Sequence, residues 1–162
     1  MMRAYFAGGC FWCLAPVFRI YGTEQVMAGY CGGQEANPEY LQVKHQTTGH
    51  RETIMVEYEP EKVSYQTLLE IYLANIDPFD DEGQYIDRGF SYSPAIYYTS
   101  EAERELAEQK LGEIAQREGK PTKVAVEPYG QFWPAEEEHQ DYYLKNPEAF
   151  ALELEESGRK PL

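Results

Sequence analysis

Two cysteines near the N-terminus have the spacing of a redox pair. Cys10 and Cys13 follow Gly8-Gly9 and stand three residues apart. A cysteine at the start of a helix meets unsatisfied backbone N–H groups and the positive end of the helix dipole, which favour the nucleophilic thiolate. The glycines before it let a substrate approach the backbone closely. The pattern therefore indicates thiol chemistry at Cys10 rather than a cysteine that only packs in the core.

Two other kinds of site use cysteines in a similar pattern. A thioredoxin-like dithiol oxidoreductase also carries Cys-x-x-Cys between a strand and a helix. A zinc module would need Cys10, Cys13, Cys31 and a histidine, but the second close cysteine pair of a zinc ribbon is missing. We therefore expect no metal and keep the dithiol oxidoreductase as the alternative.

The charge of the chain restricts its partners. The 162 residues include 28 Asp+Glu and 14 Lys+Arg, which gives a formal net charge of −14. This charge repels phosphate backbones, so we expect neither nucleic acid nor an anionic membrane as a partner. No segment is apolar enough to span a bilayer, and three cysteines are typical of a reducing compartment rather than a disulfide framework. We expect a cytoplasmic protein and, because no apolar stripe is left unexplained, a monomer.

The elements that must position the cysteines alternate between strands and helices. Periodicity predicts strands over residues 3–7, 23–30, 50–58, 94–98 and 122–127. It predicts helices from Cys10, over 64–75, from the capping box of Ser100 and Glu103 to Gly119, and over 136–144 with Pro147 as a stop signal. Residues 77–93 are expected to form a long acidic loop. With no repeat or linker, one domain over 1–162 follows, with an α/β or α+β two-layer sandwich as its architecture.

Several longer motifs accompany the cysteine pair along nearly the whole chain. They are Gly9-Cys10-Phe11-Trp12, Gly29-Tyr30-Cys31-Gly32-Gly33, Asn37-Pro38-Glu39-Tyr40, Thr48-Gly49-His50-Arg51-Glu52, Asp87-Arg88-Gly89-Phe90-Ser91-Tyr92, and the run from Ala135 to Tyr143, followed by Lys145-Asn146-Pro147. In these blocks the chain resembles the A-type peptide methionine sulfoxide reductases. The resemblance implies an α+β fold, ferredoxin-like in outline, with a mixed sheet and packed helices. It also implies reduction of methionine-S-sulfoxide, free or in proteins, with thioredoxin as reductant (dithiothreitol in vitro) and neither metal nor organic cofactor.

The resemblance assigns the central steps to two residues. Cys10 attacks the sulfoxide sulfur and becomes a sulfenic acid. Glu52 occupies the position of the acid that protonates the departing oxygen, which requires an apolar pocket to keep its carboxyl group protonated. Taken alone, Glu52 is more typical of a solvated carboxylate on the polar face of strand 50–58. We expect it to be catalytic.

Other residues match positions around the substrate in the family. Tyr40 and Tyr92 correspond to tyrosines that hydrogen-bond the sulfoxide oxygen, and Asp87 belongs to the same polar cluster. Phe11 and Trp12 are expected to form an apolar cradle for the substrate methyl group. Three further residues share one face of the helix expected over 136–144 and stay outside the predicted catalytic set, with the first two placed at the rim of the site: Glu136, His139 and Tyr142.

The second thiol is where the match is incomplete. Many relatives place a resolving cysteine in a C-terminal tail, but residues 152–162 contain none. We predict that Cys13, one helical turn after Cys10, resolves the sulfenic acid. Cys31, in a Gly-rich loop, is the alternative if the Cα atoms come within about 7 Å. Direct attack by thioredoxin or a small thiol would leave Cys13 as a packing residue.

Overall fold

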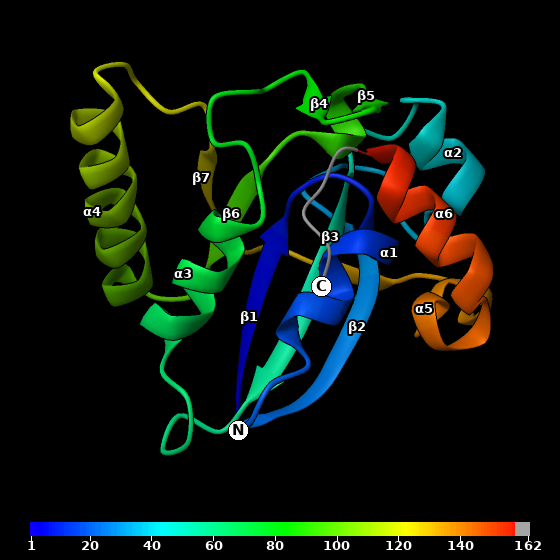
Figure 1. Cartoon of the computed structure of the whole chain (residues 1–162), viewed down its shortest axis with the longest axis horizontal. Helices are drawn as coiled ribbons and strands as arrows, with labels where there is room; N and C mark the ends of the chain where they lie inside the picture. Colours follow the sequence, from blue (N-terminus) through cyan, green and yellow to red (C-terminus); the bar gives the residue numbers. More distant parts are fainter. Residues whose placement is uncertain (158–162) are drawn as a thin grey trace.

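A six-stranded sheet lies at the centre of the computed structural model, which describes residues 1–157 (Figure 1). The strand order is β7-β6-β1-β3-β2-β8. Neighbouring strands are antiparallel except β6 and β7, which pair in parallel and make the sheet mixed. The strands are β1 (Met2–Ala7), β2 (Thr23–Cys31), β3 (Arg51–Tyr58), β6 (Ala95–Tyr98), β7 (Ala125–Pro128) and β8 (Phe132–Pro134).

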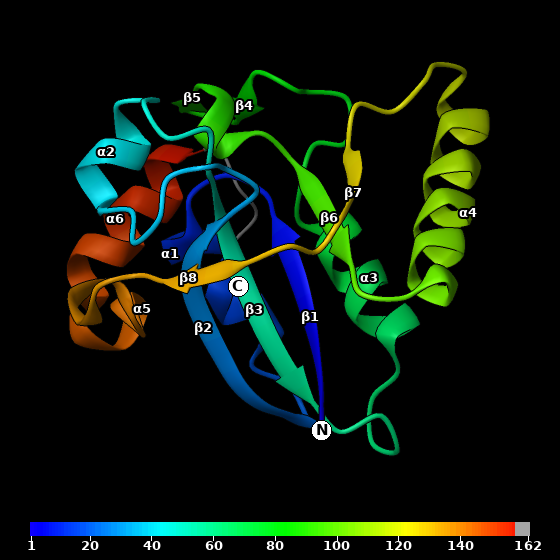
Figure 2. The ribbon, with the colours of Figure 1, turned by 180° about the vertical axis from the view of Figure 1, so that it is seen from behind.

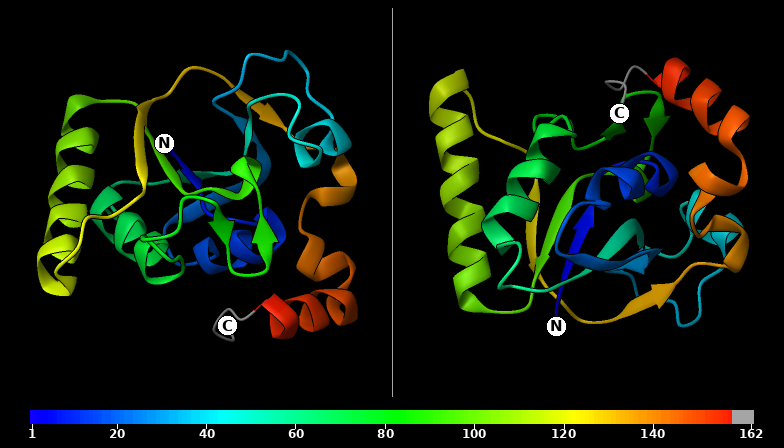
Figure 3. Two further views of the ribbon diagram at one scale, coloured as in Figure 1. Left: turned by 90° about the horizontal axis from the view of Figure 1, so that it is seen from above. Right: turned by 60° about the horizontal axis from the view of Figure 1, so that its bottom comes forward.

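The helices gather on one side of the sheet and around its edges. Seen from behind, the sheet lies in front of α1 and α3, and α4 runs beside β6 and β7 (Figure 2). Two further views place α6 on the same side of the sheet as α1 (Figure 3). The α-helices are α1 (Phe11–Leu14), α2 (Tyr40–Lys44), α3 (Tyr65–Ala74), α4 (Glu101–Glu118), α5 (Tyr142–Lys145) and α6 (Pro147–Ser157). The 3₁₀ helices are η1 (Ala15–Phe18), η2 (Phe90–Tyr92) and η3 (Glu137–His139).

The core follows from the alternation of side chains along β3. Ile54, Val56 and Tyr58 face the helices and belong to the main apolar cluster, with Leu68 of α3. Met55 faces the other side of the sheet, in a second apolar cluster. Each fully buried apolar side chain contributes roughly 1.5–3 kcal/mol. The result is a single-domain α+β fold with a mixed, curled sheet.

Most of the predicted elements are confirmed within a few residues. The Ser100 side chain accepts a hydrogen bond from the Glu103 N–H at the start of α4, and Gly119 ends the helix in the left-handed conformation (φ 71°). No helix among residues 1–157 is long and apolar enough to cross a membrane.

Three local predictions are wrong. Residues 136–144 do not form one helix, because η3 and α5 are separated by Asp141, whose φ of 52° is left-handed. Pro147 does not stop a helix but begins α6, since its fixed φ and missing N–H suit the first helical position. The acidic segment 77–93 is not an irregular loop throughout. It contains η2 and a two-stranded hairpin of β4 (Gly83–Gln84) and β5 (Asp87–Arg88).

Candidate active site

Cys10 lies in the turn between β1 and α1. It is the N-cap residue of α1, with extended backbone angles (φ −63°, ψ 124°). Gly9, directly before it, has a φ of 86°, which an L side chain rarely adopts, so glycine is required for this turn. The Cys13 N–H donates to the Cys10 carbonyl at 3.1 Å, and the two thiols hydrogen-bond to each other. The predicted redox pair is therefore formed at the predicted place.

Glu52 reaches this turn from β3 and is buried. It is 1% exposed, and its Oε1 accepts a hydrogen bond from the Phe11 N–H at 3.1 Å. The other carboxyl oxygen, Oε2, has no hydrogen-bond partner among the described residues. Burial raises the pKa of Glu52 to about 8 against the hydrogen bond from Phe11, so the group holds its proton at neutral pH. The interpretation of Glu52 as a solvated carboxylate is thus wrong.

Tyr40 and Tyr92 approach Cys10 from two other elements. Tyr40 begins α2, and Tyr92 ends η2 and is 8% exposed. Burial raises the pKa of both phenols above the ordinary value, with the charges of Glu52 and Cys10 adding to the effect. Both side chains therefore remain O–H donors. The structure brings together all five residues that the sequence assigned to catalysis: Cys10, Tyr40, Glu52, Asp87 and Tyr92.

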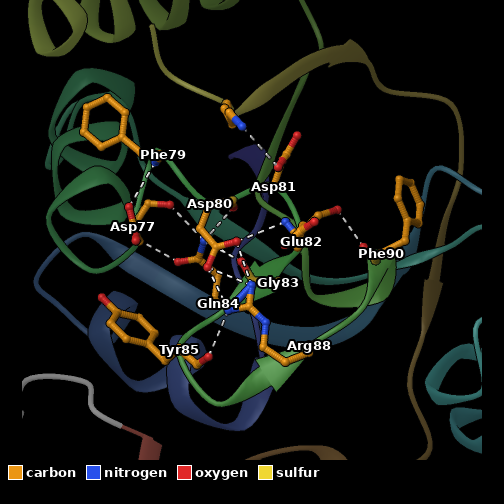
Figure 4. A network of polar contacts seen from close by, with 12 residues as sticks. Asp77, Phe79, Asp80, Asp81, Glu82, Gly83, Gln84, Tyr85, Arg88 and Phe90 are labelled. Carbon is orange, nitrogen blue, oxygen red and sulfur yellow. Dashed lines mark hydrogen bonds and ion pairs between the residues drawn. The ribbon is translucent and has the colours of Figure 1, made fainter. Parts of the chain in front are cut away.

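The segment that carries Asp87 and Tyr92 is held by its own polar contacts (Figure 4). The Arg88 guanidinium donates to both carboxylate oxygens of Asp80, at 2.6–2.8 Å. The Gln84 amide, fully buried, accepts from the Asp77 N–H at 2.6 Å and donates to the Asp77 carbonyl at 2.9 Å. These contacts fix the hairpin and so the direction from which Asp87 and Tyr92 enter the site.

Gln46 holds the same segment from outside the hairpin. Its side chain donates to Ser91 Oγ at 2.8 Å and accepts from the Ser91 N–H at 2.9 Å. Ser91 directly precedes Tyr92, so this pair of hydrogen bonds anchors η2. Sequence reasoning missed Gln46, because its partner lies 45 residues away along the chain.

The aromatic residues of the site fall into two groups: Trp12 lines a wall of the cavity, and Phe11 lies buried beneath it. Trp12 lines the cavity, stacks on Tyr142 with ring centroids 4.0 Å apart, and donates its indole N–H to Nδ1 of His139 at 3.1 Å. Phe11 lies beneath, 1% exposed, with its ring against Tyr40 at 6.1 Å. Phe11 is not among the residues that line the cavity, so the structure gives its ring a supporting place, and its backbone N–H donates to Glu52.

Glu136 and His139 support this wall from the two ends of η3, of which Glu136 is the N-cap residue. Glu136 accepts hydrogen bonds from the Tyr30 hydroxyl at 2.8 Å and from the Tyr40 N–H at 3.0 Å. His139 stacks on Tyr40 with ring centroids 4.3 Å apart. The expectation that both lie near the rim is consistent with these contacts. The resemblance to the family placed them there, whereas the single helix expected over 136–144 is replaced by η3 and α5.

The cysteine pair opens into a cavity of about 340 Å³. This volume is within the range of small-molecule sites. The predicted residues Trp12, Tyr40, Asp87 and Tyr92 line this cavity together with Glu153, Glu156 and Ser157 of α6. Phe150 of α6 packs against both cysteines, which are only 7% and 3% exposed. No pattern in the sequence predicts that the C-terminal segment covers the site.

The acidity of Cys10 differs from the expectation. The hydrogen bond with Cys13, burial and the negative charge of Glu52 together raise the pKa of Cys10 well above its ordinary value. A helix of four residues that starts in a buried, acidic environment does not offset these effects. The prediction that the helix N-terminus favours the thiolate of Cys10 is therefore wrong for the free protein. That the pKa is low in the substrate complex stays a prediction.

Cys31 lies apart from the pair. It is fully buried in the apolar cluster on the opposite face of the sheet from Cys10. Burial raises its pKa to about 12. Among residues 1–157, the one group of His, Cys, Asp and Glu side chains close enough to share a metal ion contains no cysteine. The structure therefore brings Cys13, rather than Cys31, to Cys10, and does not assemble the zinc site considered above.

Comparison with known proteins identifies the family. The family model described as peptide methionine sulfoxide reductase matches residues 2–160. The peptide methionine sulfoxide reductase MsrA of Halalkalibacterium halodurans is 47% identical over 161 residues, covering 97% of this chain and 91% of the relative. This chain belongs to the peptide methionine sulfoxide reductase family.

Solved structures agree with this assignment. Methionine sulfoxide reductase A of Corynebacterium diphtheriae superposes with a TM-score of 0.81 at 28% identity, over 90% of this chain and 74% of that one. Mxr1 from Saccharomyces cerevisiae in its reduced form gives 0.83 at 29% identity, over 91% and 86%. The similarity thus includes the fold as well as the sequence.

Proposed function

We propose that this chain is an enzyme that reduces methionine-S-sulfoxide, free or in proteins, to methionine. The observation that carries the proposal is the pairing of a nucleophile with a protonated acid. Cys10 opens into the cavity, while Glu52 is buried beside it with a pKa of about 8 and one carboxyl oxygen unpartnered. A sulfoxide needs both groups, because its oxygen leaves sulfur only when it receives a proton.

The first step transfers oxygen from substrate to enzyme. The Cys10 sulfur attacks the sulfoxide sulfur, and Glu52 protonates the sulfoxide oxygen. The Tyr40 and Tyr92 hydroxyls donate hydrogen bonds to that oxygen as charge develops on it. The bond between the two sulfurs and the sulfur–oxygen bond of the substrate then break as the hydroxyl group passes to the Cys10 sulfur, which becomes the sulfenic acid, and Cys10's own proton returns to Glu52. Thiol and sulfoxide thus become sulfenic acid and methionine.

The second step removes the oxygen as water. The Cys13 thiol attacks the sulfenic sulfur of Cys10, a disulfide forms and water leaves. The placement of both cysteines in one apolar cluster supports Cys13 in this role. Thioredoxin then reduces the disulfide by thiol exchange. The yeast relative Mxr1 has been solved in complex with Trx2.

We also propose the domain organisation, the detailed fold, the oligomeric state and the compartment of the protein. One domain of the MsrA type covers residues 1–162, of which 158–162 lie outside the described residues. The order β6-β1-β3-β2, with α1 and α3 as crossovers, supports a ferredoxin-like core with helices as a second layer. The reaction as written balances without metal or organic cofactor. We also propose a monomer in a reducing compartment such as the cytoplasm, where thioredoxin keeps thiols reduced.

Separate S and R epimers of dabsylated methionine sulfoxide test the activity, with dithiothreitol as reductant and methionine followed by chromatography. We expect the S epimer alone to be reduced and Cys10→Ser to be inactive. Cys31→Ala, which removes a thiol on the far side of the sheet, is the control and is expected to stay active. Reduction of disulfides such as those of insulin, with neither epimer reduced, would instead favour a general dithiol oxidoreductase.

A further inference from the structure

The mouth of the cavity carries an excess of negative charge. Three carboxylates line it: Asp87 from β5, and Glu153 and Glu156 from α6. Lys44 is the one cation among the lining residues that belong to the described part of the chain. Glu52 adds no negative charge while it is protonated. The cavity that receives the substrate is therefore acidic.

The two glutamates belong to the face of α6 that covers the site. Phe150, Glu153 and Leu154 follow the i, i+3, i+4 spacing of one helix face. Phe150 and Leu154 pack with the cysteine pair, which anchors this face. Glu153 is consequently half-buried at the cavity, and Glu156 is exposed one turn further on. The apolar packing of Phe150 and Leu154 places this face of α6 at the cavity. Among the described residues, neither Glu153 nor Glu156 takes part in an ion pair.

The negative charges at the mouth of the cavity repel one another. Burial raises the pKa of Glu153, and the negative charges of Asp87 and Glu156 add to this effect, while Lys44 offsets part of it. Like charges brought together in a partly buried cavity are relieved by an incoming cation and made worse by an incoming anion. The mouth therefore has an electrostatic preference for the groups next to the sulfoxide.

We propose that Glu153 and Glu156 make this cavity select methionine sulfoxides with lysine or arginine neighbours in the peptide chain, and reject those with acidic neighbours. Consecutive Cα atoms are about 3.8 Å apart, so the residues flanking a bound methionine sulfoxide stand at the mouth while its side chain enters the cavity. Their long cationic side chains can then reach the α6 carboxylates. This inference rests on the proposed function and specifies its substrate class.

Three blocked tripeptides test the inference, each with a central methionine-S-sulfoxide flanked on both sides by lysine, glutamine or glutamate. Dithiothreitol serves as reductant, so that no protein partner contributes charge. We expect kcat/KM to be on the order of tenfold higher for the lysine peptide than for the glutamate peptide at about 0.01 M ionic strength. The ratio is expected to approach unity at about 1 M salt, where screening is strong.

Variants locate the effect on α6. The double variant Glu153→Gln with Glu156→Gln is expected to bring the ratio of kcat/KM values close to unity. Glu148→Gln with Glu155→Gln removes the same charge from exposed positions of the same helix and is expected to keep the wild-type ratio. Far-UV circular dichroism and thermal unfolding report that both double variants are folded.

The possible failures are distinguishable. Equal rates on the three peptides, with all of them reduced, would overturn the inference and leave the proposed function standing. A ratio that survives in the Glu153→Gln, Glu156→Gln variant, or falls equally in the control, would overturn the role of these two residues. Reduction of none of the peptides would overturn the proposed function and this inference with it.

Discussion

The Phe11 N–H donates a 3.1 Å hydrogen bond to Oε1 of Glu52. This contact joins the first turn of α1, which holds Cys10, to β3, which holds the acid. One carboxyl oxygen is thereby fixed, and the other is left without a partner among the described residues. Nucleophile and acid are thus held by a backbone contact that no side-chain substitution at Phe11 removes directly.

The stability of the protein should depend on pH through Glu52. Its pKa is raised from 4.5 to about 8 in the fold, so the folded protein keeps a proton that the unfolded chain has released. This contribution is fully present below the unfolded pKa and is lost as the pH rises through 8. A shift of this size corresponds to up to about 5 kcal/mol. We expect the free energy of unfolding of wild type to fall between pH 5 and 8, and that of Glu52→Gln to fall much less.

Urea unfolding at the two pH values measures this difference. Glu57→Gln is a control on the same strand, because the Glu57 carboxylate pairs with exposed Arg3 at the surface. Parallel losses in wild type and Glu52→Gln would contradict the raised pKa of Glu52.

Replacement of Cys13 should separate the two steps of the reaction, which are oxygen transfer to Cys10 and disulfide formation. Without reductant, Cys13→Ser is expected to form one methionine per enzyme and to stop as a sulfenic acid at Cys10, which dimedone traps and mass spectrometry locates. Cys31→Ala should instead form the disulfide as wild type does. A disulfide between Cys10 and Cys31 in wild type would assign the resolving role to Cys31.

Removal of a tyrosine hydroxyl should lower kcat at two positions and leave it unchanged at a third. Tyr40→Phe and Tyr92→Phe are each expected to lower kcat about tenfold, because each loses a donor to the sulfoxide oxygen. Tyr65→Phe removes a buried hydroxyl that has no partner among the described residues. It is expected to leave kcat unchanged and to stabilise the protein by about 1 kcal/mol. A Tyr65→Phe variant as slow as the other two would show that the kinetic loss is not specific to the site.

The covering helix should control access to the cysteines. Phe150→Ala removes the ring that packs on Cys10 and Cys13, so α6 should leave the site more often. We expect iodoacetamide to alkylate the pair faster than in wild type. Leu152→Ala changes an exposed residue of the same helix, 55% exposed, and is the control. Equal alkylation rates in Phe150→Ala and wild type would show that α6 does not limit access.

The sequence predicted the fold where elements carry strong periodicity or a clear cap. Alternation placed β3, and the burial of Glu52 follows from it too, since Glu52 is two residues before Ile54 and shares its buried face. The strand pattern therefore contained the evidence against a solvated Glu52. Ser100 and Gly119 bounded α4 because both act through local backbone contacts.

The sequence did not predict what depends on distant contacts. The pKa of Cys10 is raised by the hydrogen bond with Cys13, by burial and by the negative charge of Glu52, which is 42 positions on, and of these the last two could not be read from the local sequence. Segments far apart in the sequence are also joined by the hydrogen bonds of Gln46 with Ser91 and by the packing of Phe150 on the cysteines. The C-terminal helix begins at Pro147, a residue that fits a helix start as well as a stop.

A single-turnover pH profile measures the joint action of Cys10 and Glu52 on the sulfoxide. Reduced enzyme is mixed with the S epimer in the absence of reductant, and methionine is measured against time between pH 5 and 10. The account predicts one methionine per enzyme, a rate that falls above pH 8 as Glu52 loses its proton, and a rate lower by about 10²–10⁴-fold in Glu52→Gln. Methionine formation by Cys10→Ser, or a flat profile with Glu52→Gln unaffected, would contradict it.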